Sequence, residues 1–171
     1  LGWSALRTSL SGDNNFAAGQ CALYSNWGGS HNAAIGYRAL LSNTTGYDNV
    51  GIGQDALLTN STGYNNAAIG RNALTNNSTG HNNQAIGYGA LNNNTTGDQN
   101  TGLGCYALRG NTVGNYNFAG GYASLYSNLS GNDNTAIGCR ALFCNWGGCY
   151  NIALGNGAIY NNTTGSDNTA I

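Results

Sequence analysis

Small and apolar residues return along the chain with a fixed period of 17 residues. Taking the first glycine of each period as phase 1, the consensus is G-x-x-A-L-x-x-N-T-T-G-x-x-N-x-A-I. Ten such repeats account for Gly2–Ile171 without an insertion or deletion. Residues 1–171 are therefore predicted to form one repeat domain, a segment of a longer fibre. The phase-1 glycines are Gly2, Gly19, Gly36, Gly53, Gly70, Gly87, Gly104, Gly121, Gly138 and Gly155.

The repeat is typical of a coil of β-structure. Seventeen residues are too few for two helices and a turn, and two glycines per repeat disfavour a helix. Two short strands are expected in each repeat, such as Asn66–Ile69 and Ala73–Asn76, joined by turns rich in Gly and Asn. Coils stacked ~4.8 Å apart would make an all-β, parallel β-solenoid of ten coils, a rod roughly 48 Å long.

Side-chain size predicts which face of each strand is inside. Phase 5 is almost always Leu and phase 17 mostly Ile or Leu, so these two phases are expected to fill the coil. Phases 4 and 16 hold Ala, Ser or Gly and point the opposite way along a strand. They are expected to lie against another copy of the chain; a monomer with tight local turns is the alternative.

Asparagine occupies phase 14 in every repeat. Stacked Asn side chains satisfy one another's amides along the axis of a β-assembly. A structural ladder is therefore predicted at Asn15, Asn32, Asn49, Asn66, Asn83, Asn100, Asn117, Asn134, Asn151 and Asn168.

Composition excludes several classes of protein. Charged residues make up 6% of the chain and aromatic residues 10%, which is unlike a disordered chain. The net charge of −1 gives no electrostatic case for nucleic acid as a partner. No apolar run approaches the ~20 residues of a membrane-spanning helix, so no membrane span is expected in this segment.

Catalytic and metal chemistry find little support. The two histidines, His31 and His81, lie in turns about three coils apart, and no Ser-His-Asp or Cys-His pattern accompanies them. Turn aspartates are scattered over several coils, whereas a divalent ion needs about six converging oxygens. We expect no enzyme activity, no cofactor and no metal site; the aspartates in question are Asp13, Asp48, Asp98, Asp133 and Asp167.

The N-T-T-G turn carries two further candidate properties. Its hydroxyl pairs, such as Thr44-Thr45, suggest an ice-binding face as a remote alternative, although a plain turn accounts for them better. The same turn creates N-x-S/T sequons, which would form a ridge of sugars in a host that glycosylates secreted proteins. These candidate glycosylation sites are Asn43, Asn60, Asn77, Asn94, Asn128 and Asn162, and turn geometry is the other explanation for an Asn at phase 8.

Aromatic residues gather at phases 2 and 6. An interface or ligand contact is one interpretation, since Tyr is enriched at recognition surfaces, and strand preference is the other. The residues are Trp3, Tyr24, Tyr37, Tyr88, Tyr122, Tyr126, Phe143 and Tyr160.

Five cysteines leave at least one thiol free or joined to another chain. Cys105 and Cys139 share a phase two coils apart, about 9.6 Å by the strand spacing, which is too far for a disulfide. Cys144 and Cys149 flank one turn and are the candidate pair.

A second, longer period is visible in the irregular turns. Ser9–Gly12 is echoed by Asn128–Gly131, and Asn26–Gly29 by Asn145–Gly148. Both offsets are 119 residues, or seven coils. The chain is therefore predicted to contain a super-repeat of seven coils.

The segments Asn32–Gly36, Asn66–Gly70 and Asn134–Gly138 resemble the N-x-A-I-G signature of YadA-like head repeats, found in trimeric autotransporter adhesins and related tail-fibre-like proteins. The resemblance covers every repeat, although the family's repeat is a few residues shorter and lacks part of the N-T-T-G turn. It implies a left-handed parallel β-roll, a homotrimer and a role in surface attachment.

The expected function is thus a structural or adhesive fibre segment, an adhesin head or stalk or a tail-fibre shaft. It would lie outside the cell, on a cell or virion surface, with copies of itself and a surface receptor or glycan as partners. A self-assembling extracellular filament subunit without receptor binding is the alternative.

Overall fold

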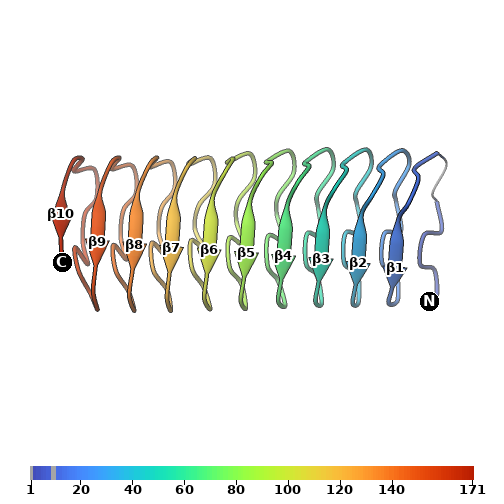
Figure 1. Ribbon diagram of the computed structural model, residues 1–171, viewed down its shortest axis with the longest axis horizontal. Coiled ribbons are helices and arrows are strands. Elements are labelled where there is room, and N and C mark those ends of the chain that lie inside the picture. Colours follow the sequence, from blue (N-terminus) through green and yellow to red (C-terminus); the bar gives the residue numbers. More distant parts are fainter. Residues whose placement is uncertain (1, 9–10) are drawn as a thin grey trace.

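The computed structural model describes residues 2–8 and 11–171 and shows one rod of stacked coils, with the two ends of the chain at opposite ends of the rod (Figure 1). Each coil contributes one strand to a single parallel sheet whose strands follow chain order. The described residues contain no helix. The strands are β1 (Phe16–Ala18), β2 (Ala33–Ile35), β3 (Val50–Ile52), β4 (Ala67–Ile69), β5 (Gln84–Ile86), β6 (Thr101–Leu103), β7 (Phe118–Gly120), β8 (Thr135–Ile137), β9 (Ile152–Leu154) and β10 (Thr169–Ala170).

The register of the sheet confirms the predicted parallel β-solenoid. Ala67 in β4 pairs with Val50 in β3 and with Gln84 in β5, so each neighbour is 17 residues away. Identical phases therefore stack directly on one another along the rod. The period read from the glycines is the period of the coil.

The second predicted strand is wrong. Around Leu74 the chain turns: Asn72 has φ 59° and Leu74 has φ 49°, which is left-handed backbone. Neighbouring coils are still hydrogen-bonded to each other at this turn, since the N–H of Leu74 donates to the carbonyl of Ala90 at 3.0 Å. The same conformation recurs in the other coils, so stacking outweighs the cost of placing Leu where Gly or Asn is usual.

The core is narrower than the sequence suggested. Ala68 at phase 16, Ala73 at phase 4 and Leu74 at phase 5 are all fully buried inside one coil, whereas Ile69 at phase 17 is 39% exposed. A methyl group added at Gly51, a phase-16 glycine, would lie 3.3 Å from the Leu40 side chain. The coil has room for one large side chain, which the Leu supplies, and the strand opposite must therefore present Ala or Gly.

Two predictions fail with that geometry. Phase 17 does not fill the coil, and phases 4 and 16 do not face another chain. Their small size is explained by packing within a single chain, so it no longer argues for association.

The two invariant glycines are fixed by close approach of neighbouring coils. Gly53, at phase 1, has φ +130°, and a Cβ there would lie 2.7 Å from the backbone of Gly70. Gly63, at phase 11, would place a Cβ 2.4 Å from both the Gly80 carbonyl oxygen and Asn60 Oδ1. No side chain fits either place.

Candidate functional site

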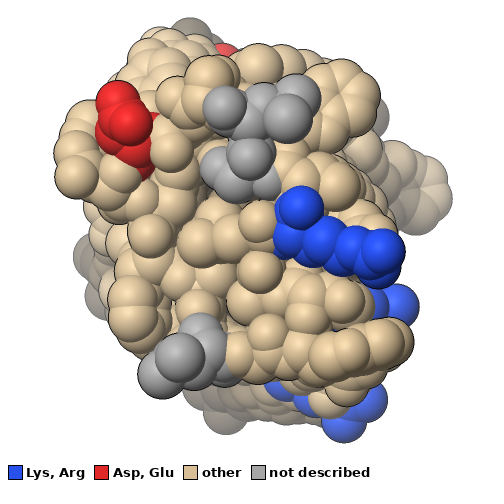
Figure 2. Space-filling view, turned by 90° about the vertical axis from the view of Figure 1, so that its right-hand side faces the viewer, with Lys and Arg blue, Asp and Glu red and all other residues tan. Residues whose placement is uncertain are grey.

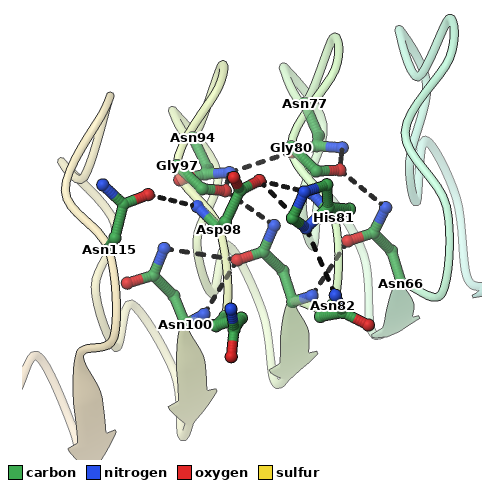
Figure 3. A network of polar contacts seen from close by, with 12 residues as sticks. Asn66, Asn77, Gly80, His81, Asn82, Asn94, Gly97, Asp98, Asn100 and Asn115 are labelled. Carbon is green, nitrogen blue, oxygen red and sulfur yellow. Dashed lines mark hydrogen bonds and ion pairs between the residues drawn. The ribbon is translucent and has the colours of Figure 1, made fainter.

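One wall of the coil is a ladder of buried asparagines. The backbone N–H of Asn66 donates to Asn49 Oδ1 at 3.0 Å. Asn66 Nδ2 donates to the Gly80 carbonyl at 2.9 Å, as Figure 3 shows. The corresponding backbone bond recurs from Asn32 to Asn168, so the ten asparagines predicted at phase 14 lie in one continuous row. The row binds the coils together.

A second asparagine ladder, at phase 8, was not foreseen. Asn77 Nδ2 donates to Asn60 Oδ1 and to the Gly80 carbonyl, each at 2.8 Å (Figure 3). Gly80 thus accepts hydrogen bonds from both ladders, through Asn66 and Asn77. We call phases 8, 11 and 14 the Asn–Gly wall. The signal in the sequence was an Asn at phase 8 in nine of ten repeats.

The candidate glycosylation sites belong to this wall. In each sequon the Asn Nδ2 atom, to which a sugar would be attached, donates to two acceptors inside the coil. Five of the six side chains are fully buried, namely Asn43, Asn60, Asn77, Asn94 and Asn128, and Asn162 is half-buried. A glycan would replace one of the two Nδ2 hydrogens and break one of these bonds. The burial and bonding therefore favour turn geometry, the other explanation for Asn at phase 8, and glycosylation stays a prediction.

The hydroxyl groups of the N-T-T-G turn also point along the rod. Thr44 Oγ1 donates to the Ser61 carbonyl at 2.8 Å, and Ser61 Oγ donates to the Ser78 carbonyl at 2.9 Å. Thr95 and Thr112 continue the row. The first hydroxyl of each pair therefore has a structural role, whereas the second, as at Thr45, Thr62 and Thr79, is exposed.

Charge is divided between two edges of the rod. All five arginines lie at phases 2, 3 or 6, together with one aspartate, Asp55, so these phases carry a formal charge of +4. The other five aspartates lie at phases 12 and 13. Seen along the axis, the arginines gather on one side and acidic groups on the other (Figure 2). We call phases 2, 3 and 6 the Arg–Tyr edge and phases 12 and 13 the Asp–His edge.

A groove of about 380 Å³ lies on the Arg–Tyr edge near the C-terminal end. The rings of Tyr126, Phe143 and Tyr160 stack along its length, with centroids 5.0 Å apart and planes within 11°. Arg109 lies over Tyr126 at 5.5 Å and hydrogen-bonds to its hydroxyl. Arg140 lies 6.0 Å from the Tyr122 ring. Neither arginine is paired with a carboxylate in the described part of the chain.

A second groove, of about 510 Å³, lies on the same edge near the N-terminal end. It is lined by Trp3, Arg7, Tyr24, Arg38 and Leu41 among others. Arg7 lies 5.9 Å from the Tyr24 ring, whereas Arg38 Nε is only 2.7 Å from Asp55 Oδ1. That hydrogen bond raises the pKa of Arg38. Arg7 is thus the unpaired cation of this groove.

On the Asp–His edge each histidine lies beside an aspartate of the next coil. His31 Nδ1 is 3.7 Å from Asp48 and His81 Nδ1 is 3.3 Å from Asp98 (Figure 3 shows the second pair). The His81 ring also lies against Tyr64, at 4.6 Å. Within residues 2–8 and 11–171, no three His, Cys or acidic side chains are grouped as a metal site requires.

The candidate disulfide is not formed. Cys144 pairs through its backbone with Ser127 and Asn161 in the neighbouring coils. The Cys149 thiol instead lies 3.6 Å from the Gly147 carbonyl and 3.3 Å from the Asn132 nitrogen. All five cysteines are free thiols.

The outer face of the sheet is mostly apolar, with polar side chains only at Gln84, Thr101, Thr135 and Thr169. It consists of phases 15 and 17, which contain no charged residue in any repeat. We call it the sheet face. Large side chains are exposed on it by 39 to 55%, namely Phe16, Ile35, Ile69, Ile86, Ile137 and Ile152.

Comparison with known proteins adds no relative. No family model, no curated protein and no solved structure matches the chain. A separate search of the described residues found no helix suited to crossing a membrane.

Proposed function

We propose that this chain is a segment of an extracellular attachment fibre, built as a homotrimer of solenoids that meet through their sheet faces. The sheet face carries the proposal. It is an uncharged, mostly apolar strip with exposed Ile at several coils, and monomeric proteins rarely expose large apolar patches.

The regular spacing of the sheet face favours a second copy of this chain as its partner. Side chains of one phase repeat along it every coil, so a partner must have the same spacing to fit at every coil. A second copy of this chain has that spacing by construction. A cyclic trimer would bury the strip of each chain on a common axis and leave the Arg–Tyr and Asp–His edges in contact with solvent.

The resemblance to YadA-like head repeats supports the same arrangement and a position on a cell or virion surface. The chemistry of the interior supports a mechanical role. Buried polar groups in the described residues are all hydrogen-bonded, and those bonds run mainly from coil to coil.

Sedimentation equilibrium tests the proposal. The wild type is expected to have three times the chain mass, and Ile69→Thr/Ile86→Thr to shift toward monomer, because Thr keeps the branched shape but adds a polar group to each exposed position. Val113→Thr is the matched control, since Val113 is an equally exposed aliphatic side chain away from the sheet face.

Two results would contradict the trimer. A wild type that stays monomeric at high concentration shows that the sheet face has no self-partner. An open-ended series of masses supports the filament alternative instead, in which coils stack end to end.

A further inference from the structure

The two grooves on the Arg–Tyr edge occupy equivalent places in the super-repeat. Three residues of the N-terminal groove have a counterpart in the C-terminal groove 119 residues later, at the same phase. The pairs are Trp3 and Tyr122, Tyr24 and Phe143, and Leu41 and Tyr160. Seven coils of ~4.8 Å place the grooves ~34 Å apart on one edge of the rod. The seven-coil period thus repeats the position of a groove and three of its lining phases. The arginines are not repeated in this way, since Tyr126 stands 119 residues after Arg7 and Cys21 stands 119 residues before Arg140.

We propose that the two grooves are a pair of binding sites for one acidic polysaccharide, a polymer of uronic acids lying along the rod. Each groove combines aromatic rings with an arginine that has no carboxylate partner, Arg109 and Arg140 in the first and Arg7 in the second. The inference deepens the proposed attachment function by naming the class of ligand.

The arginines supply recognition of carboxylate. A guanidinium offers paired N–H donors that match a carboxylate, and a ring beneath it limits its freedom. Arg109 lies between the rings of Tyr106 and Tyr126, at 5.4 and 5.5 Å. No acidic side chain lines the C-terminal groove. An acidic ligand there meets fixed donors and no repulsion.

The aromatic row supplies the apolar part of recognition. Tyr126, Phe143 and Tyr160 form an unbroken row across three coils, and their half-buried or exposed rings form one side of the groove. Tyrosine gives a rigid amphipathic contact at low entropic cost. Sugar rings have apolar C–H faces that suit such a row, whereas a chain of phosphates has none.

The shape of the edge favours a sparsely charged polymer. Residues of four successive coils line the C-terminal groove, a length of ~14 Å along the axis. The whole edge carries a formal charge of only +4. Duplex DNA carries one charge per ~1.7 Å and gains affinity from many phosphate contacts, which this edge does not offer. One carboxylate per sugar is a closer match.

Titration calorimetry with polygalacturonate tests the proposal. Arg109→Gln/Arg140→Gln is expected to weaken binding by about tenfold or more, since each lost charge-assisted bond contributes about tenfold. Arg71→Gln is the matched control, because Arg71 is exposed on the same edge but lines neither groove. Equal weakening by Arg71→Gln would show that only net charge matters and would overturn the site.

The choice of polymer separates the two parts of recognition. The methyl ester of polygalacturonate keeps the sugar rings and removes the charge, and it is expected to bind at least about tenfold more weakly. Tyr126→Leu/Phe143→Leu is expected to weaken polygalacturonate binding. The matched control is Tyr47→Leu/Tyr64→Leu, which alters a stacked pair on the Asp–His edge and should leave the affinity unchanged. Polyphosphate binding as tightly as polygalacturonate, with no effect of the groove rings, would overturn the sugar assignment.

The spacing of the grooves gives an independent test. A polymer long enough to span ~34 Å is expected to bind at least about tenfold more tightly than an oligomer that reaches one groove. Trp3→Ala/Arg7→Gln should remove that advantage, abolish oligomer binding at the N-terminal groove and leave the oligomer affinity of the C-terminal groove unchanged. No advantage of the long polymer in the wild type would overturn the pairing. Each groove is built within one chain, so these results stand whether or not the chain forms a trimer.

Discussion

The Asn–Gly wall and the Arg–Tyr edge belong to the same coils but differ in how strictly they repeat. Phase 11 is Gly and phase 14 is Asn in all ten repeats, whereas phase 6 alone holds Arg, Tyr, Leu, Thr, Asn and Phe. Wall residues are buried and bonded to the next coil, as Asn77 is, and edge residues such as Tyr160 are exposed. Strict repetition therefore indicates what stacking requires, and the variable edge is where individual coils can differ in what they bind.

The largest effect on stability is expected from a substitution in the core, which lies between the Asn–Gly wall and the Arg–Tyr edge. Leu74→Ala should lower the free energy of unfolding by about 2–5 kcal/mol, because Leu74 is the one large side chain filling its coil. Thermal melts followed by circular dichroism measure it. A loss below that of an exposed control such as Val113→Ala would contradict the core assignment.

A smaller but clear effect is expected in the wall. Asn77→Ala removes hydrogen bonds to Asn60 and Gly80 and should cost about 1–3 kcal/mol. Asn76→Ala is the matched control, since Asn76 is the exposed neighbour of the same residue type. Equal melting temperatures for the two variants would show that the buried ladder adds nothing to stability.

The sheet face should matter little to the stability of a single chain. Ile69→Ala is expected to cost less than about 2 kcal/mol within a single chain, because 39% of the Ile69 surface is already exposed. Chemical unfolding at concentrations at which sedimentation shows a monomer is the measurement. A loss as large as that of Leu74→Ala would mean that phase 17 lies inside the coil after all.

The smallest effect is expected on the Asp–His edge. His81→Ala removes a ring contact with Tyr64 and a polar contact with Asp98, both half-buried, and should change stability by less than about 1 kcal/mol. Thermal melts at neutral pH check this. A loss of 2 kcal/mol or more, about the size expected for Asn77→Ala, would show that this edge is part of the stacking network.

Much of the fold could be predicted from the sequence because the coil repeats without error. The spacing of Gly36, Gly53 and Gly70 gave the period, the register and the parallel sheet. The inside of the coil could not be predicted by size alone. Ile69 and Leu74 are both large, and only the left-handed turn at Leu74 decides which of them points inward.

The candidate site was visible only in part. The aromatics at phases 2 and 6 were noticed, but their pairing with Arg109 and Arg140 depends on the turn geometry and on contacts between coils. The sequons were visible, but their burial on the Asn–Gly wall could not be predicted from the motif, which marks exposed Asn in other proteins. A sequence pattern gives the phase of a residue, and only the coil gives its direction.

The most direct test of the contrast between wall and edge is the affinity of two variants for polygalacturonate, measured below the melting temperature of both. Asn77→Ala should bind like the wild type, because the wall only holds the coils together. Arg109→Gln/Arg140→Gln should lose about tenfold or more. If both variants bind like the wild type, or if Asn77→Ala loses as much affinity as the arginine variant, the division of the coil into a stacking wall and a binding edge is wrong.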